Sequence, residues 1–216
     1  MKKFLITLIA IILILSFLGI ISFSLVGSHT KTETNSTSIE NTVDTFEAAD
    51  GKVYTLYKQY DPRWAEEEYW GKTMKRKGCG ITAVAIILSG YGQKVTPKDL
   101  QKKYYPVMAY ENMSQELQDN YNLKSSGFYY DSDSLSEEKI LKHLKENKPM
   151  IVCAWAENGI NRWTKNSHYL TLLAADEKDN IYVANPGGRD YGPNKNGWYK
   201  ASQVVPYLAK VLYIEE

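Results

Sequence analysis

The sequence predicts an α+β fold, with helices in the first half of the folded chain and a largely antiparallel sheet in the second. One observation is the run after Cys79, "ITAVAIIL", which is apolar on most of its circumference and therefore typical of a central core helix. The other is the change of periodicity after Pro149, where short apolar and β-branched runs are typical of strands. Helices followed by strands, rather than alternating with them, favour the α+β class.

Local signals place the individual elements. Glycines stop the core helix, and each later helix begins near a residue that can cap it. Turn-rich segments separate the strands. In chain order we first expect an extended or turn segment at Asp61-Pro62 and the core helix, which ends at Gly90 and Gly92. Three further helices are expected: one from Thr96-Pro97 with Asp99 in its first turn, a weaker one at 113–121, and one from Ser134 and Glu137 to about Asn147. Strands are then expected in "MIVCAW", "HYLTLLAA" and "IYVAN", with the turn "DEKDN" between the last two, and in the final segment "KVLYI".

The composition is that of an ordinary globular protein and gives no indication of nucleic-acid binding. The chain has 216 residues, 44% of them hydrophobic, and a formal net charge of +1, which suits one domain of moderate size. Its one basic cluster, Lys75-Arg76-Lys77, is too short to form a nucleic-acid surface. The oligomeric state does not follow from these numbers.

The beginning of the chain is typical of an exported protein. Three residues, Met1-Lys2-Lys3, precede an uncharged apolar run, Phe4–Val26, whose length favours a membrane anchor with the lysines in the cytoplasm. Small residues, Val26 and Ser28, would also allow cleavage of a signal peptide after Ser28. The polar, Thr/Ser/Asn-rich segment that follows is expected to be a flexible tether. The predicted organisation is an anchor or signal peptide at 1–28, a tether at 29–50 and a folded domain at 51–216, held outside the cell membrane or secreted after cleavage.

Cys79, within "KRKGCGITA", is the first candidate for chemistry. A lone Cys beside an apolar helix usually serves as buried packing. Here glycines flank the Cys, and they allow a substrate to approach it closely. The free N–H groups at the start of the following helix lower the pKa of a thiol at this position. The nearby cations Lys75, Arg76 and Lys77 lower the same pKa. The position therefore suits a thiolate nucleophile. Cys153 lies in "PMIVCAW", which we expect to be a buried strand, where a small thiol packs without a partner. A Cys79–Cys153 disulfide, which export would permit, is the alternative.

A thiol nucleophile needs a base, and elimination among the histidines leaves His168. His29 lies in the tether, and His143 occupies a helix position expected to be solvated. His168 begins a strand after the polar loop "TKNS", where its side chain can reach a cleft. Asn185 ends the next strand, and a hairpin centred near Asp176-Glu177 would place it opposite His168 to orient the imidazole. On the other interpretation, Asn185 only fills a turn before proline.

Taken together, these motifs resemble a known family. The segments "QYDPRWAEEEYW…KRKGCGITAVAIIL", "NKPMIV", "SHYLTLLAA" and "YVANPGG" are similar, in this order, to stand-alone exported relatives of the bacteriocin-leader-processing (double-glycine) peptidases. These belong to the papain-like cysteine peptidase superfamily. The resemblance runs from about Gln59 to the C-terminus. It implies a papain-like fold, in which the helix that carries the Cys packs on the sheet that carries the His and Asn.

The resemblance also implies a site. Cys79 falls on the family's nucleophile, His168 on its base, and Gln59 on the residue whose side-chain amide lines the oxyanion hole. Asn185 falls on the third position, where the family usually has Asp and papain-like enzymes at large have Asn. The implied reaction is acyl transfer from a peptide or protein substrate, without a cofactor or metal. Two alternatives stay open: a peptidoglycan amidase or endopeptidase of the CHAP or NlpC type, and a catalytically inactive surface binding module.

Overall fold

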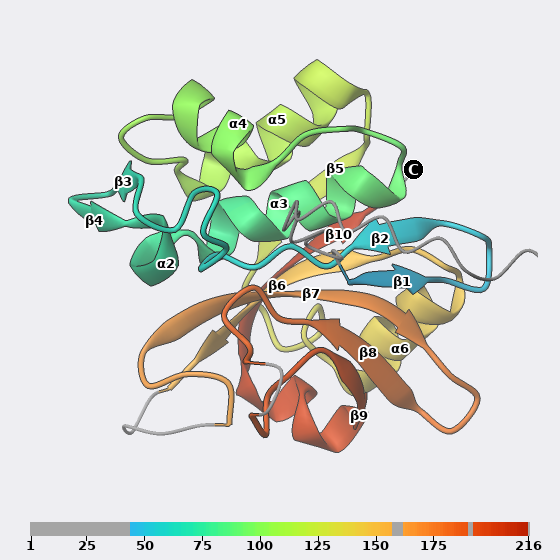
Figure 1. Ribbon diagram of the computed structural model, residues 1–216. Coiled ribbons are helices and arrows are strands. Elements are labelled where there is room, and N and C mark those ends of the chain that lie inside the picture. The colour runs from blue at the N-terminus through green and yellow to red at the C-terminus, as the bar shows by residue number, and fades with distance from the viewer. Residues whose placement is uncertain (1–43, 157–161, 190–191, 216) are drawn as a thin grey trace, which may run out of the picture. The chain divides into compact units, whose positions relative to one another are not determined.

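A computed structural model describes residues 44–156, 162–189 and 192–215, which belong to one compact unit, Thr42–Glu216. At its centre is an antiparallel sheet with helices on both faces (Figure 1). Within the described residues its six strands lie in the order β5, β10, β6, β7, β8, β9. The strands are β5 (Ser125–Tyr129), β6 (Met150–Trp155), β7 (Ser167–Ala175), β8 (Asn180–Ala184), β9 (Gly197–Lys200) and β10 (Leu208–Ile214).

The predicted core helix is α3 (Cys79–Gly90), and it packs on one face of the sheet against β6 and β7. Every side chain from Ile81 to Leu88 is completely buried, which explains why the run is apolar all round. Another helix, α6 (Glu137–Lys145), covers the opposite face (Figure 1). The remaining helices are α2 (Met74–Lys77), α4 (Pro97–Lys103) and α5 (Tyr110–Tyr121), with the 3₁₀ turns η1 (Ala201–Gln203) and η2 (Val205–Tyr207).

The central strands are apolar throughout because both of their faces are buried. In β6, Ile151 and Cys153 face the core formed with α3, whereas Met150, Val152 and Ala154 face the core formed with α6. Side chains of a strand alternate between the two faces of its sheet, so a strand between two helical layers needs apolar residues at every position. The structure thus confirms the predicted α+β class and the predicted central helix on a largely antiparallel sheet.

Two predicted helix starts have different outcomes. Thr96 caps α4 as predicted, with its side-chain oxygen accepting from the Asp99 N–H at 3.3 Å and the Asp99 carboxylate accepting from the Thr96 N–H at 3.0 Å. The prediction for α6 is wrong by two residues: Ser136, not Ser134, is the cap and accepts from the Lys139 N–H. Ser134 instead closes a preceding turn by donating its N–H to Asp131 at 2.8 Å. Either serine could cap a helix, but Ser134 is part of the turn that begins at Asp131, so the helix starts after Ser136.

A hairpin outside the main sheet was not predicted. Strand β1 (Thr45–Glu47) pairs with β2 (Val53–Thr55), so a described strand lies inside the segment 29–50 that the sequence predicts as tether. The Phe46 ring stacks on Tyr182 of β8 at a centroid distance of 3.7 Å. One aromatic anchor in a polar segment, together with strand pairing, is enough to bring this segment onto the domain.

The predicted segment 1–28 and most of the tether lie outside the described residues. Among the residues that the structure describes, no helix is long and apolar enough to cross a membrane.

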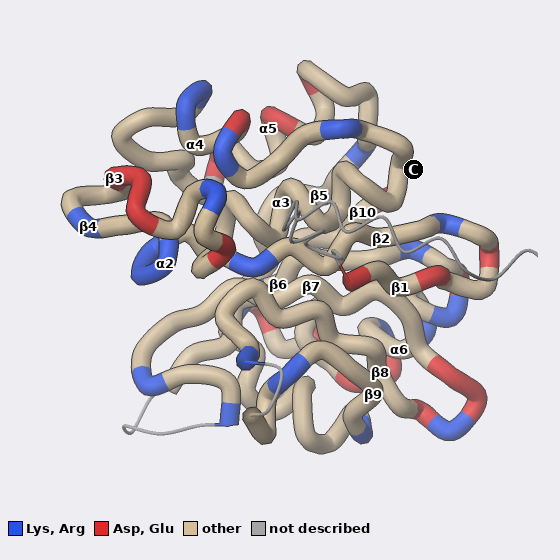
Figure 2. Tube along the Cα trace, viewed as in Figure 1, with Lys and Arg blue, Asp and Glu red and all other residues tan. Residues whose placement is uncertain are grey.

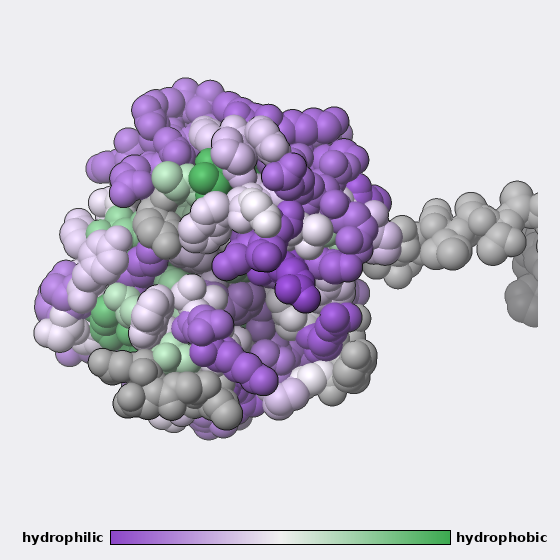
Figure 3. Space-filling model, turned by 90° about the vertical axis from the view of Figure 1, so that its left-hand side faces the viewer, coloured by the Kyte–Doolittle hydropathy of each residue, from purple (hydrophilic) through white to green (hydrophobic). Residues whose placement is uncertain are grey.

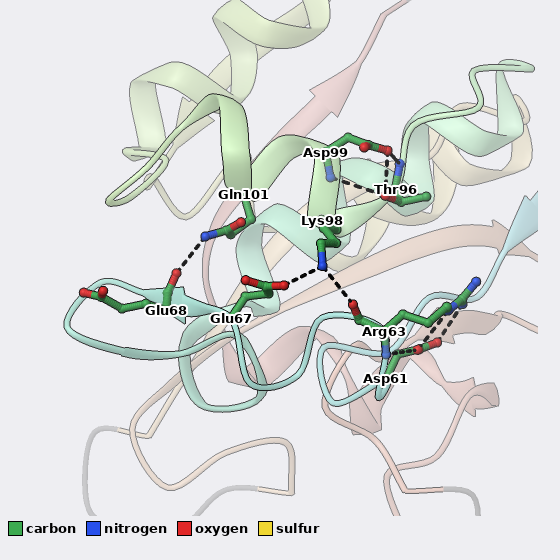
Figure 4. A network of polar contacts seen from close by, with 8 residues as sticks. All are labelled: Asp61, Arg63, Glu67, Glu68, Thr96, Lys98, Asp99 and Gln101. Carbon is green, nitrogen blue, oxygen red and sulfur yellow. Dashed lines mark hydrogen bonds and ion pairs between the residues drawn. The ribbon is translucent and has the colours of Figure 1, made fainter.

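A second small hairpin, β3 (Glu68–Tyr69) and β4 (Lys72–Thr73), precedes α2. Its two turn residues, Trp70 and Gly71, both have positive φ, at 53° and 64°, as a two-residue type I′ turn requires. Asn is the usual residue at the first position, and the left-handed region costs other non-glycine residues roughly 1–2 kcal/mol. Helix α4 holds this hairpin in place through Lys98, whose Nζ lies 2.5 Å from the Glu67 carboxylate, and Gln101, whose amide donates to the Glu68 carbonyl at 2.8 Å (Figure 4).

Candidate active site

Three elements bring Cys79, His168 and Asn185 to one place. Cys79 is the first residue of α3, His168 is the second residue of β7, and Asn185 directly follows the last residue of β8. Because α3 packs on β7 and β7 pairs with β8, the ends of all three elements meet. Cys79 and His168 are half-buried, whereas Asn185 is fully buried.

The imidazole of His168 is held by Asn185. Its Nε2 lies 2.7 Å from the Asn185 side-chain oxygen Oδ1. Since a carbonyl oxygen only accepts hydrogen bonds, Nε2 must carry a proton and donate. This leaves Nδ1 as the ring nitrogen for the hydrogen bond between His168 and the Cys79 thiol.

The orientation of the Asn185 amide is itself fixed from both ends. Its Oδ1 accepts a second hydrogen bond, from the Gly187 N–H at 2.9 Å, and its Nδ2 donates to the Asn194 carbonyl at 2.8 Å. The Asn185 main-chain N–H donates to the side chain of Asn196 at 2.8 Å. The amide oxygen therefore has to face His168, and the amide nitrogen has to face away from it.

The route by which Asn185 reaches His168 differs from the expected hairpin register. Strand β7 pairs Ala175 with Ile181, which centres the turn on residue 178, and a bulge follows between Leu172 and Ala174. The cross-strand partner of His168 is Ala154 of β6, not Asn185. The chain leaves β8 after its last residue, and the Asn185 side chain then reaches back to the imidazole.

The electrostatics of Cys79 and His168 favour a thiolate beside an imidazolium. Burial raises the pKa of the Cys79 thiol, but the hydrogen bond and charge of His168, together with the N–H groups of Tyr169 and Gly80, outweigh it and lower this pKa below its ordinary value. Burial lowers the pKa of His168, but Cys79 and then Asn185 outweigh it and raise this pKa. The two shifts are in opposite directions, as an ion pair requires.

The side chain of Gln59 approaches that of His168 next to Gly187. Its main-chain N–H donates to the Pro186 carbonyl at 2.9 Å, and its side-chain Nε2 donates to the Lys75 carbonyl at 2.7 Å. Its Oε1 is buried without a hydrogen-bond partner among the described residues. A Cβ added at Gly187 would lie 2.9 Å from His168 Cε1 and 3.4 Å from Gln59 Oε1, so only glycine fits between these two side chains.

The glycines around Cys79 provide space rather than an unusual turn. Gly78 has a φ of −80°, which any residue adopts, but an added Cβ would lie 2.6 Å from the Met74 carbonyl oxygen. At Gly80 an added Cβ would lie 2.5 Å from the end of Met113 and 3.3 Å from Tyr169. Gly78 is therefore not required by its backbone conformation, and close packing explains both glycines.

Cys79 and His168 open onto a groove of about 620 Å³. Its walls come from the β3–β4 hairpin with α2, from residues 107–113, and from residues 164–169. A separate cavity of about 440 Å³, which includes Tyr129, His143 and Tyr213, contains none of the candidate residues. The groove is thus the described cavity in which a substrate could meet the thiol.

Of the two described residues expected to have no role in chemistry, one is placed as predicted and the other is not. Cys153 is buried in β6, where burial raises its pKa to about 11. Both cysteines are free, so the alternative of a disulfide is not realised in this structure. The prediction for His143 is wrong: it is half-buried, with its ring 4.6 Å from that of Tyr213, and burial lowers its pKa. A helix position beside the apolar face can be covered by a neighbouring strand, here β10.

Several residues of the site were not predicted from the sequence. Gly187, Asn194 and Asn196 fix Asn185, and Trp70 lines the groove from the hairpin. The glycine pair that follows Asn185 in "NPGG" was a visible signal for close packing, because glycines next to a site residue permit close approach. The two asparagines lie in a loop rich in polar residues, where no pattern separates them from their neighbours.

Comparison with known proteins identifies the family. The sequence model described as "Peptidase_C39 like family" matches residues 51–206, which is more than half of the chain. The chain belongs to the Peptidase_C39-like family. A Peptidase_C39-like chain with this arrangement of helix and sheet is a cysteine peptidase of papain-like fold, and the predicted enzyme class is confirmed. Membership of the exported, double-glycine group stays a prediction.

Nineteen chains of solved structures match this Peptidase_C39-like chain significantly. A Bacillus anthracis protein described as a C39-like peptidase is 15% identical, with a TM-score of 0.48, and the match covers 74% of this chain and 94% of that one. UfSP from C. elegans is 11% identical, with a TM-score of 0.45, and the match covers 82% of this chain and 35% of that one. No curated protein matches the sequence significantly.

Proposed function

We propose that this peptidase hydrolyses peptide bonds with Cys79 as nucleophile, His168 as acid and base, Asn185 as the residue that orients His168, and Gln59 as an oxyanion donor. The observation that carries the proposal is the 2.7 Å contact between His168 Nε2 and Asn185 Oδ1. It leaves Nδ1 for Cys79, and the opposite pKa shifts of these two side chains support a thiolate–imidazolium pair.

The reaction follows from this pair. The Cys79 thiolate attacks the peptide carbonyl carbon, a C–S bond forms, and the carbonyl oxygen takes the electron pair. The second hydrogen of Gln59 Nε2 and the Cys79 N–H at the start of α3 stabilise this oxyanion, typically by about 2.7–4 kcal/mol per donor. The C–N bond then breaks as His168 gives its Nδ1 proton to the leaving amine.

The second half of the reaction regenerates the thiolate. Water gives a proton to His168 and attacks the thioester, and the C–S bond breaks to release the carboxylic acid. Asn185 keeps the imidazole aligned in both halves because its oxygen accepts from Nε2 whichever state Nδ1 is in. Of the groups that the proposal uses, Cys79 and His168 line the groove.

Degradation assays with two kinds of substrate test this proposal. The purified chain and its Cys79→Ala variant are incubated with a peptide library and, separately, with cell-wall sacculi. We expect new peptide N-termini in the library with the wild type alone. Release of soluble fragments from sacculi without cleavage of the library would instead favour the amidase, and no Cys79-dependent product from either would favour an inactive module.

The proposed function includes export. It is supported by the sequence alone, through the uncharged run Phe4–Val26 and the lysines that precede it. The peptidase domain would then act outside the cytoplasmic membrane on extracellular peptides or proteins.

A further inference from the structure

The floor of the groove is apolar and uncharged. Tyr69, Met108 and Met113, which line it together with Cys79, are all at most 3% exposed. Tyr69 accepts a hydrogen bond from the Met108 N–H at 3.0 Å, and burial raises its pKa to about 12. The phenol therefore stays neutral at physiological pH, and the floor suits an apolar side chain.

One wall of the groove presents an aromatic ring in a strained position. Trp70 is 55% exposed although it lines the groove, and its φ of 53° lies in the left-handed region. The main-chain N–H of Trp70 donates to the Pro106 carbonyl at 2.8 Å, and the Lys77 Nζ lies 5.0 Å from the centre of the Trp70 ring. A large aromatic residue kept exposed in a turn that favours Asn is typical of a ligand contact.

The rim of the groove is basic. The lining includes the exposed cations Arg76, Lys77 and Lys165 and one carboxylate, Glu111, which leaves a net charge of three minus one, or +2. None of the three cations is in an ion pair with a described residue. Figure 2 shows the basic residues of α2 side by side, and Figure 3 shows white and green patches interrupting the hydrophilic surface on this side of the molecule.

We propose that the groove binds a substrate segment in which a large apolar side chain is flanked by Asp or Glu. The apolar side chain would lie on the floor and against Trp70, and the neighbouring carboxylates would face Arg76 and Lys165. Guanidinium and ammonium groups without partners bind carboxylates most favourably beside a desolvated apolar contact. This inference rests on the proposed function, because the bound segment is part of the peptide that reaches Cys79.

Binding to the full-length Cys79→Ala variant tests the inference without turnover. Four short peptides of equal length are compared by calorimetry: leucine flanked by glutamate, by glutamine or by lysine, and alanine flanked by glutamate. We expect the leucine–glutamate peptide to bind about tenfold or more tightly than the lysine and alanine peptides, and added salt to weaken it. Equal affinities, or tighter binding of the lysine peptide, would overturn the inference.

Substitutions in the Cys79→Ala background assign the two parts of the site. Trp70→Asn should weaken the leucine–glutamate peptide about tenfold while leaving the thermal midpoint unchanged or raised, because Asn relieves the left-handed conformation. Arg76→Gln and Lys165→Gln should each weaken that peptide about two- to fivefold and leave the glutamine peptide unaffected. The control Lys94→Gln removes an exposed charge outside the groove and should change neither.

A structural role for Trp70 predicts a different pattern, in which Trp70→Asn lowers the thermal midpoint together with binding of all peptides. That pattern would contradict the inference.

Turnover by the wild type separates this inference from the proposed function. Cleavage of all four peptides at the same rate would remove the inference and leave the cysteine peptidase intact. Selective binding by Cys79→Ala without any cleavage by the wild type would remove the proposed reaction and leave the binding site.

Discussion

Asn185 is built into its loop as an amide. Its Nδ2 donates to the Asn194 carbonyl at 2.8 Å, so a carboxylate at this position would direct an oxygen at another oxygen. The relatives that the sequence resembles usually have Asp here, and an Asp would suit His168 but not Asn194. The residue is therefore specified by its second contact as much as by the imidazole.

We expect Asn185→Asp to lower both stability and activity, even though Asp serves in related enzymes. The buried carboxylate would lose its partner at Asn194, which should reduce the free energy of unfolding by about 1–3 kcal/mol. Asn185→Ala should lower the upper pKa of the kcat/KM profile, because Asn185 helps to raise the pKa of His168. Urea unfolding and pH–rate profiles of both variants make the measurement. An Asp variant as stable as the wild type would contradict this account of the loop.

The role that we propose for Gln59 is confined to the transition state. Its spare amide hydrogen would act where negative charge develops, and it makes no contribution to forming the thiolate. Gln59→Ala should lower kcat about 10²–10³-fold with little change in KM, while alkylation of Cys79 by iodoacetamide continues at a near-normal rate. Steady-state kinetics and labelling of the same preparation make the comparison. Full turnover in this variant would place the oxyanion donor elsewhere.

At the scale of elements, long apolar segments were predicted from the sequence and short ones were not. The helix after Cys79 and the strand after His168 carry enough buried residues to fix their period, and the folded structure keeps both. The β3–β4 strands have two residues each, too few for any period, and β1 depends on one aromatic residue, Phe46, meeting β8. Cys79, His168 and Asn185 could be proposed from the sequence because each lies next to the start or end of a predicted helix or strand.

The contacts of β1 give a test at this scale. Phe46 stacks on Tyr182 and approaches Tyr54 and Trp198, so Phe46→Ala removes the anchor of the hairpin. We expect the free energy of unfolding to fall by about 1–3 kcal/mol. Val53→Ala in the paired strand is the control, because Val53 is 47% exposed and should cost less than about 0.5 kcal/mol. Equal small effects in both variants would mean that β1 contributes nothing to stability.

For the whole molecule, the prediction that extends beyond the described residues concerns the N-terminus. The run Phe4–Val26 is long enough to span a bilayer, so the protein should stay in the membrane fraction after a carbonate wash. Added protease should digest the peptidase domain in intact cells stripped of their wall. Recovery of the whole population as a soluble chain that begins at about His29 would show a cleaved signal peptide instead.

The central claim is that Cys79 is a thiolate maintained by His168, and alkylation of both cysteines against pH tests it most directly. Cys79 should react with iodoacetamide with a pKa below that of a free thiol, which is about 8.5. His168→Ala should abolish that fast phase. Cys153, with its pKa raised to about 11, should be only about one part in 10⁴ thiolate at pH 7 and inert in the folded protein. Mass spectrometry of both sites against time gives the rates. If Cys79 instead titrates as an ordinary thiol, or at the same rate in His168→Ala, the account of this site is wrong.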